Sequence, residues 1–156
     1  MKKKNIVDCT AYLFYEQNED GSRKADGIIG LQPVYQTKKA ACADLAMPYP
    51  ATIPPMSVMK FDLWIGFEIP EGYKIIMYPR SSLLTKKKLI QPVSIIDKDY
   101  SGQHIHVPLA NFTNEPVELD KGERIAQIEC VPAYDCVDWT RIECDRTGGF
   151  GSTGAK

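Results

Sequence analysis

Short apolar segments, separated by proline and glycine, dominate the pattern of hydrophobic and polar positions along the chain. No stretch keeps the 3.6-residue apolar period of an amphipathic helix for three turns. Within residues 104–109, Ile105, Val107 and Leu109 alternate with two histidines and a proline, as a strand with one buried face requires. The pattern therefore predicts an all-β domain with at most one short helix.

Six segments carry this strand pattern. They are residues 6–15, 30–36, 58–68, 73–78, 104–112 and 124–131. Residues 82–89 are predicted to form the short helix, and the polar, glycine-punctuated stretch 18–27 is predicted to be an exposed loop. Pro108 has no backbone N–H, which places it at a sheet edge or at a bulge.

The length of 156 residues suits one domain that buries roughly 70% of the surface exposed by its unfolded chain. Hydrophobic residues make up 44% and charged residues 25%, which is ordinary for a globular protein and argues against a disordered or fibrous chain. We find no internal repeat. We expect a single β domain over residues 1–147 and a flexible, glycine-rich tail over residues 148–156.

The formal net charge of -1 provides no long-range attraction for nucleic acid or for an anionic membrane, so we expect neither as a partner. No segment reaches the roughly 18 apolar residues that span a bilayer, and the lysines at positions 2–4 are not followed by an apolar signal region. We therefore expect a cytoplasmic protein. The five cysteines include no C-x-x-C pair, which favours reduced, mostly structural thiols.

His104 and His106 are two residues apart and would share one face of a strand. Such a pair could in principle chelate a metal ion. No third ligand is evident nearby in the sequence, so an ordinary surface strand is the favoured interpretation.

Three segments bring chemically useful groups together. Asp97, Asp99 and Tyr100 lie in a turn between apolar strands, although such a turn by itself is more often a solvated hairpin. Arg80 and the two serines that follow it offer a guanidinium, two hydroxyls and a helix start to an anion, although either serine could simply cap the helix. Phe150 lies among glycines and hydroxyls, which suits a flat phosphorylated ligand as well as a frayed terminus.

Together, five segments resemble in order the five motifs of the trimeric dUTPase family. They are residues 41–45, 79–83, 94–102, 122–127 and 148–154. The third and fifth segments are the most specific of the five. The resemblance implies an all-β, jelly-roll-like barrel or sandwich that forms a homotrimer, with active sites shared between subunits. It also implies hydrolysis of dUTP to dUMP and pyrophosphate with Mg²⁺.

The resemblance further implies roles for single residues. Asp97 would be the general base that activates water for attack on the α-phosphorus, and Tyr100 would lie under the deoxyribose. Asp44 would organise waters around the Mg²⁺ ion. The phosphate oxygens would be held by Arg80, Ser81, Ser82 and Gln127.

Uracil would be read by backbone groups of a hairpin around residues 91–100, which includes Gln91, Ser94 and Ile96. A fixed pattern of donors and acceptors there would exclude cytosine, and a tight wall would exclude the methyl group of thymine. Phe150 would be a lid over the base. The terminal phosphate would contact Gly151, Ser152, Thr153 and Arg146.

The chain departs from the family pattern at several positions. Cys42 and Ser94 stand where the first and third motifs usually have glycine, and Gln91 stands where an asparagine is common. The arginine usual five residues before the lid is Asp145 here, while Arg146 lies one residue closer. These departures concern the uracil loop and the contact to the terminal phosphate.

Two other functions remain open from the sequence. A dCTP deaminase, or a bifunctional deaminase and dUTPase of the same fold, would carry a catalytic glutamate after the third motif, but residues 104–109 contain no acid. A regulatory or interaction protein that only binds dUTP would have no need of Asp97. The long segment 18–30 could still serve a partner.

Overall fold

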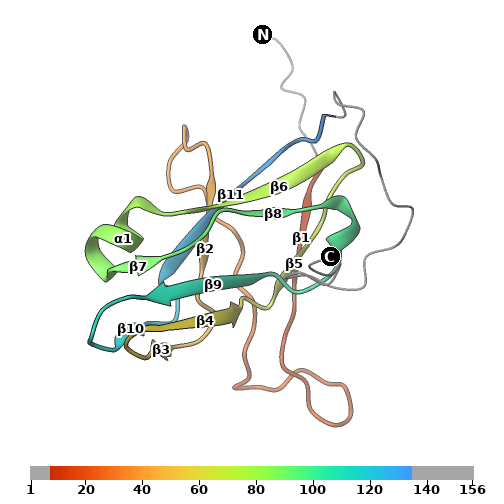
Figure 1. Cartoon of the computed structure of the whole chain (residues 1–156). Coiled ribbons are helices and arrows are strands. Elements are labelled where there is room, and N and C mark those ends of the chain that lie inside the picture. Colours follow the sequence, from red (N-terminus) through yellow and green to blue (C-terminus); the bar gives the residue numbers. More distant parts are fainter. Residues whose placement is uncertain (1–7, 135–156) are drawn as a thin grey trace, which may run out of the picture.

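All strand pairs in the computed structural model, which describes residues 8–134, are antiparallel. The largest sheet has the order β2 (Ala43–Ala46), β11 (Arg124–Pro132), β6 (Tyr73–Pro79) and β8 (Ser94–Ile96). A second sheet has the order β4 (Ser57–Asp62), β9 (His106–Asn111) and β7 (Leu89–Ile90). Two shorter pairs join β1 (Thr10–Leu13) to β5 (Ile65–Glu68) and β3 (Ala51–Ile53) to β10 (Val117–Leu119). Figure 1 shows these layers, which do not close into one continuous barrel.

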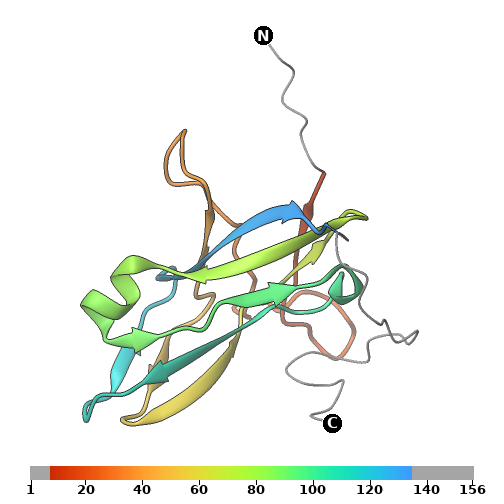
Figure 2. The same ribbon diagram turned by 45° about the horizontal axis from the view of Figure 1, so that its top comes forward.

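The single α-helix of residues 8–134 is α1 (Ser81–Lys87), and a 3₁₀ turn, η1 (Lys98–Tyr100), follows β8. Figures 1 and 2 place α1 and η1 at opposite ends of β6. The helix was predicted over 82–89 but stops earlier, because Lys88 adopts a left-handed conformation with φ 57°. The expected all-β fold with one short helix is confirmed.

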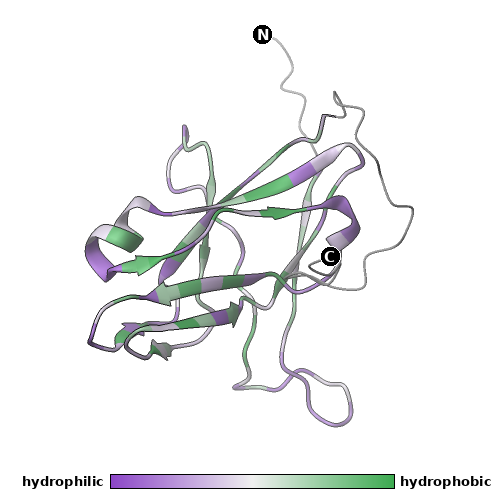
Figure 3. Ribbon diagram, in the orientation of Figure 1, coloured by the Kyte–Doolittle hydropathy of each residue, from purple (hydrophilic) through white to green (hydrophobic). Residues whose placement is uncertain are grey.

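Alternation along the strands builds the core. Val107 and Leu109 of β9 are completely buried, and Ile75 and Met77 of β6 are nearly so. Figure 3 shows hydrophobic residues along the strands of both larger sheets. Each such side chain stabilises the fold by about 1.5–3 kcal/mol relative to its exposed state. Burial of Ile75 and Met77 therefore fixes which residues of β6 face the core and which face away from it.

Three predicted strands, 73–78, 104–112 and 124–131, are confirmed as β6, β9 and β11. The predicted strand 6–15 contains β1, and its residues before Asp8 lie outside the described part. The predicted strand 58–68 is divided at Trp64, which has φ 52°. The Asp62 Oδ1 atom accepts a hydrogen bond from Trp64 N at 2.7 Å, and the chain turns there from the β4 sheet to the β5 sheet.

The predicted strand 30–36 is wrong. Only an isolated bridge between Val34 and Asp44 forms there, and the Tyr35 side chain is 61% exposed. Pro33 lacks an amide hydrogen for a ladder, which explains why the apolar pattern did not produce a strand. Pro108, in contrast, lies within β9 opposite Lys60, beyond the two residues that β7 pairs, so it stands at a sheet edge as predicted.

The segment between β1 and β2 begins with a largely exposed loop, residues 15–29, which is called the excursion below. Isolated bridges pair Tyr15 with Ile29 and Gln17 with Arg23, and most side chains of 18–26 are exposed, as predicted. At the end of this loop, Gly30 donates its N–H to the Phe14 carbonyl at 2.9 Å. Within residues 8–134, no helix has both the length and the apolar content to cross a membrane.

Candidate active site

Residues from three strands meet around the predicted metal-organising residue. Gln127 of β11 is in register with Asp44 of β2 on one side and with Tyr78 of β6 on the other. Arg80 follows the end of β6 directly, and Gln127 Nε2 donates a hydrogen bond to the Pro79 carbonyl at 2.9 Å. The sheet therefore gathers Asp44, Arg80 and Gln127, which are far apart in the sequence.

The Asp44 carboxylate is buried, at 8% exposure, and is shared by two guanidinium groups. Arg80 Nε donates to Asp44 Oδ1 at 3.0 Å, and Arg124 Nη1 donates to Asp44 Oδ2 at 3.1 Å. A buried carboxylate needs such partners because an unpaired buried charge is costly. Arg124 was not among the predicted site residues, although its place in the fourth sequence segment could have indicated it.

Arg80 also contacts its own helix. Its Nη1 atom donates to the Arg124 carbonyl at 3.1 Å and lies 3.4 Å from Ser82 Oγ. Arg80 itself occupies the N-cap position of α1, and no side-chain capping bond is present there. The alternative that Ser81 or Ser82 caps the helix is therefore wrong, and Ser81 lies exposed at the first residue of α1.

A cleft of about 310 Å³ opens beside this cluster. Four cationic side chains and one acidic side chain line it, together with Ser82. The acid is Glu123, which pairs with Lys87 at 3.0 Å. The cations are Arg80, Lys86, Lys87 and Arg124. The cleft thus carries a surplus of positive charge, which suits a ligand with several negative charges.

The predicted base and the predicted sugar platform lie together on another part of the protein. Asp97 is half-buried and extended at the N-cap of η1, and Tyr100 donates its N–H to the Asp97 carbonyl at 3.1 Å. The Tyr100 ring packs against the core, and its hydroxyl donates to the His104 carbonyl at 3.2 Å. Because β8 pairs with β6 while β9 pairs with β4 and β7, this segment crosses between sheets and is not a hairpin.

Gln91 and Ser94, two of the predicted uracil-loop residues, differ in environment. Gln91 is buried, at 4% exposure, and its Oε1 atom has no hydrogen-bond partner among residues 8–134. Ser94 is in register with Met77 of β6, and Ile96 points into the core. The stretch 91–96 therefore contains one buried amide oxygen that can still accept a hydrogen bond.

Strand register separates the two groups of site residues within one chain. Ile96 pairs with Ile75, so Asp97 follows at the level of Lys74, whereas Arg80 lies six residues farther along β6 and its extension. At about 3.3 Å per residue, the separation is roughly 20 Å. A single chain therefore holds the Asp44, Arg80 and Gln127 cluster apart from Asp97 and Tyr100.

Mg²⁺ prefers oxygen ligands and often binds through one or two carboxylates and substrate phosphates. Residues 8–134 contain no group of three His, Cys, Asp or Glu side chains placed to hold a metal ion. Asp44 is a single buried carboxylate beside the cationic cleft, and both its oxygens already accept arginine hydrogen bonds. This arrangement fits an ion carried by phosphate oxygens and contacted through water, rather than a protein cage.

His106 begins β9 whereas His104 lies just before the strand, and both histidines approach a carboxylate that sequence reasoning missed. His104 Nδ1 is 2.8 Å from Asp62 Oδ2, and His106 Nε2 is 4.0 Å from the same atom. Burial lowers the pKa of His106 below its ordinary value, which favours its neutral form. The predicted tail residues Arg146, Phe150, Gly151, Ser152 and Thr153 lie outside the described residues.

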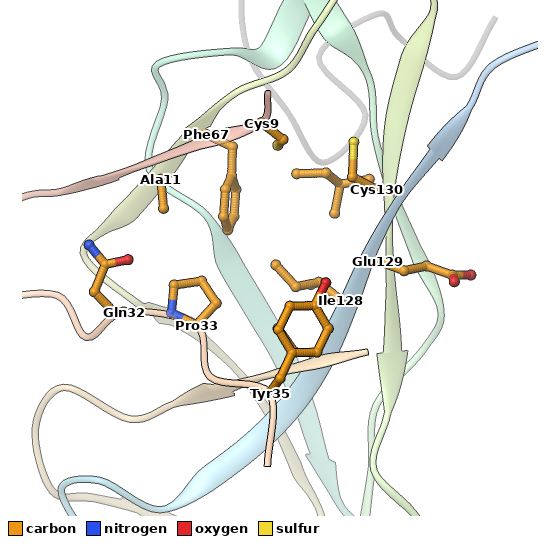
Figure 4. A pocket seen from close by; sticks show the side chains of 11 residues that line it. Cys9, Ala11, Gln32, Pro33, Tyr35, Phe67, Ile128, Glu129 and Cys130 are labelled. Carbon is orange, nitrogen blue, oxygen red and sulfur yellow. The ribbon is translucent and has the colours of Figure 1, made fainter. Parts of the chain in front are cut away.

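A second cleft, of about 250 Å³, lies between β1, β5 and β11 and holds none of the predicted site residues (Figure 4). Cys9 and Cys130 lie near each other on its wall, and both are free thiols. Burial raises the pKa of Cys9 to about 12 and also raises that of Cys130. Protonated thiols are poor nucleophiles, which supports the prediction that these cysteines are structural.

Comparison with known proteins places this geometry in a family. The family model described as dUTPase matches residues 31–154. The deoxyuridine 5'-triphosphate nucleotidohydrolase of Hydrogenobaculum sp. is 37% identical over 131 residues, covering 80% of this chain and 90% of the relative. The human mitochondrial protein of that name is 38% identical over 128 residues, covering 78% of this chain and 50% of the relative.

Solved structures show the same fold. The crystal structure of dUTPase from Streptococcus mutans has a TM-score of 0.66 and 28% identity, covering 70% of this chain and 90% of that chain. A mutant dUTPase from phage phi11 of S. aureus, which coordinates a structural Mg(II) ion, has a TM-score of 0.66 and 18% identity, covering 86% and 97% of the two chains. With the motif order and the strand register described above, these matches leave one conclusion: this chain belongs to the dUTPase family.

Proposed function

We propose that this protein hydrolyses dUTP to dUMP and pyrophosphate with Mg²⁺, as a homotrimer whose active sites are shared between chains. The observation that carries the proposal is the division of the site residues along β6. The phosphate-binding chemistry lies at one end and the candidate base lies roughly 20 Å away at the other. A second copy that brings its Asp97 to the cleft beside Arg80 completes one site.

The cationic cleft supports binding of a triphosphate. Such a ligand carries about four negative charges, and two unit charges 4 Å apart interact by about 4 kcal/mol at an effective dielectric of 20. We expect Arg80, Ser81, Ser82 and Gln127 to hold phosphate oxygens. Arg80 and Ser82 line the cleft, Ser81 between them is exposed, and Gln127 donates to the Pro79 carbonyl next to Arg80. Bound Mg²⁺ would neutralise further phosphate charge, and Asp44 would orient its waters.

Asp97 supplies the proton acceptor in this proposal. Its carboxylate removes a proton from a water molecule, whose oxygen bonds to the α-phosphorus while the bond to the bridging oxygen of the leaving pyrophosphate breaks. The η1 turn holds the backbone of Asp97 in place, because Tyr100 N–H donates to the Asp97 backbone carbonyl. A base held in place in this way avoids the entropic cost of positioning it during the reaction.

Tyr100 gives the sugar preference. Packed beneath the C2′ carbon of the sugar, its ring leaves no partner for a ribose hydroxyl, whose unpaired burial costs on the order of 1–3 kcal/mol. Backbone groups around residues 91–100, with Gln91, Ser94 and Ile96, would read the uracil edge. The buried Gln91 Oε1 atom, which lacks a partner among residues 8–134, supports a binding role for this stretch.

The remaining contacts belong to the tail of residues 148–156, which we propose as a segment distinct from the β domain of 1–147. Phe150 would cover the base, because an aromatic ring among glycines can close over a flat ligand. The terminal phosphate would be held by Gly151, Ser152, Thr153 and Arg146. Closure of this kind excludes water from the reacting groups.

A pyrophosphate-release assay tests the proposed function. Purified protein is given dUTP, UTP, dTTP or dCTP, each with Mg²⁺ and each with a chelator. We expect turnover of dUTP alone, and only with Mg²⁺. Ammonia release from dCTP would indicate a deaminase instead, and tight dUTP binding without pyrophosphate release would indicate a binding protein.

A further inference from the structure

We infer that Phe14, Asp62 and His104 are positioning residues for Tyr100, and that they set its selection of deoxyribose over ribose. The inference rests on the proposed function, because it concerns the side chain proposed to pack under the sugar. None of the three residues lies in the five family-like sequence segments. They act through the backbone carbonyl that receives the Tyr100 hydroxyl.

The first link is the carbonyl of His104. It accepts a hydrogen bond from Tyr100 Oη at 3.2 Å and another from His106 Nδ1 at 3.0 Å. The tyrosine therefore reaches across the turn to a backbone atom four residues later. Any movement of the His104 peptide moves the acceptor that fixes the outer end of the Tyr100 ring.

The second link is the side chain of His104, which is held on two sides. Its Nδ1 atom donates to Asp62 Oδ2 at 2.8 Å, while Asp62 Oδ1 accepts from Trp64 N at 2.7 Å. Its ring stacks on Phe14 with centroids 3.9 Å apart and an interplanar angle of 25°. Asp62 and Phe14 together hold the imidazole, and with it the peptide that carries the acceptor.

The third link joins this cluster to the excursion after β1. Phe14 N donates to the Trp64 carbonyl at 2.9 Å, and Gly30 N donates to the Phe14 carbonyl at 2.9 Å. A Cβ atom at Gly30 would lie 1.9 Å from the Trp64 oxygen, so the two segments touch backbone to backbone. The excursion therefore closes over the Phe14 end of the cluster and restrains the ring that stacks on His104.

Loss of this positioning should affect the selection of deoxyribose over ribose more than the rate of the hydrolysis step. A ring that can move away from the sugar makes room for a 2′-hydroxyl and for the water that solvates it. The ground-state fit of deoxyribose then weakens, while Asp97 and the phosphate cluster keep their places. Loss of the His104 anchor should therefore raise the KM for dUTP more than it lowers kcat, and should improve the relative use of UTP.

The test compares kcat/KM for dUTP and UTP in His104→Ala. We expect the ratio of kcat/KM for dUTP to kcat/KM for UTP to fall about three- to tenfold. This is the effect of losing one intramolecular hydrogen bond, here the one from His104 to Asp62. His104→Asn, which keeps an N–H donor near Asp62, should recover part of the ratio. Phe14→Leu, which removes the stacked ring, should lower it in the same direction.

Two comparisons separate positioning from general destabilisation. Val107→Ala removes buried volume from β9 without touching the hydrogen-bond chain, so it should lower the melting temperature and leave the ratio unchanged. In a Tyr100→Phe background, which lacks the hydroxyl, His104→Ala should change the ratio by less than about twofold. A ratio unchanged in His104→Ala, or lowered equally by Val107→Ala, would overturn the inference.

A readout without turnover distinguishes this inference from the proposed function. In protein with ring-labelled tyrosine, the Tyr100 NMR signal is assigned from its loss in Tyr100→Phe. The signal should shift in His104→Ala and stay in place in Val107→Ala. Wild-type protein that fails to hydrolyse dUTP would count against the proposed function, whereas an unmoved Tyr100 signal in His104→Ala would count against the positioning role.

Discussion

At the scale of single residues, the chemistry of the cluster depends on contacts between distant positions. Asp44 meets Arg80 and Arg124, which are 36 and 80 residues away in the sequence. Asp44 and Arg80 could be proposed as site residues from short motifs. Their direct ion pair could not, because it depends on the register of β2 and β11, which no local pattern contains.

Asp97→Asn tests the proposed base. We expect turnover of dUTP to fall about 10²-fold or more, because the amide cannot accept the proton of the attacking water. Binding of a non-hydrolysable dUTP analogue, measured by calorimetry, should stay close to that of the wild type because the shape of the side chain is kept.

Glu71→Gln is the matched control for that variant. It makes the same change of charge at an exposed carboxylate in the turn before β6, and turnover should be unchanged. Near-normal hydrolysis of dUTP by Asp97→Asn would show that Asp97 is not the base.

At the scale of elements, long alternating strands were predictable and short ones were not. β6, β9 and β11 follow from their apolar periodicity, which local sequence contains. β7 and β8, of two and three residues, are too short for a periodic pattern and are defined by their pairing with β9 and β6. Apolar strands were expected on both sides of Asp97, but the pairing of β8 with β6, which sets the position of this proposed base, could not be predicted from local sequence.

Gly30→Ala tests the backbone contact that holds the excursion after β1. The added Cβ would lie 1.9 Å from the Trp64 carbonyl oxygen, so one of the two segments must move. We expect the free energy of unfolding, measured by urea denaturation, to fall by about 1–3 kcal/mol or more.

Gly21→Ala provides the comparison within the same excursion. Gly21 has φ +82° and nothing within 4 Å of a built Cβ, so its substitution costs about 1 kcal/mol of left-handed strain without a clash. Equal stability of the two variants would show that the excursion is not held against Trp64.

At the scale of the whole molecule, the division of the site predicts complementation between inactive variants. Asp97→Asn lacks the proposed base, and Arg80→Ala lacks a proposed phosphate contact but keeps the hydrogen bond from Arg124 to Asp44. If each site takes these residues from different chains, mixed assemblies refolded from equal amounts should restore about a quarter of the sites. Pyrophosphate release by the mixture measures this recovery.

The control mixture combines Asp97→Asn with a chain that carries both substitutions. No intact base is present there, so no activity should return. Absence of recovery in the first mixture as well would place the complete site within one chain and contradict the shared arrangement.

The roughly 20 Å between the two ends of β6 also bears on how the enzyme comes into being. If the active sites are shared between chains, as proposed, a newly folded single chain has no complete active site until it associates with other copies. Specific activity should therefore fall on dilution below the assembly constant, and rise more steeply than chain concentration when synthesis begins. Association of the chains, rather than folding of each chain, would then be the step that activates nucleotide hydrolysis.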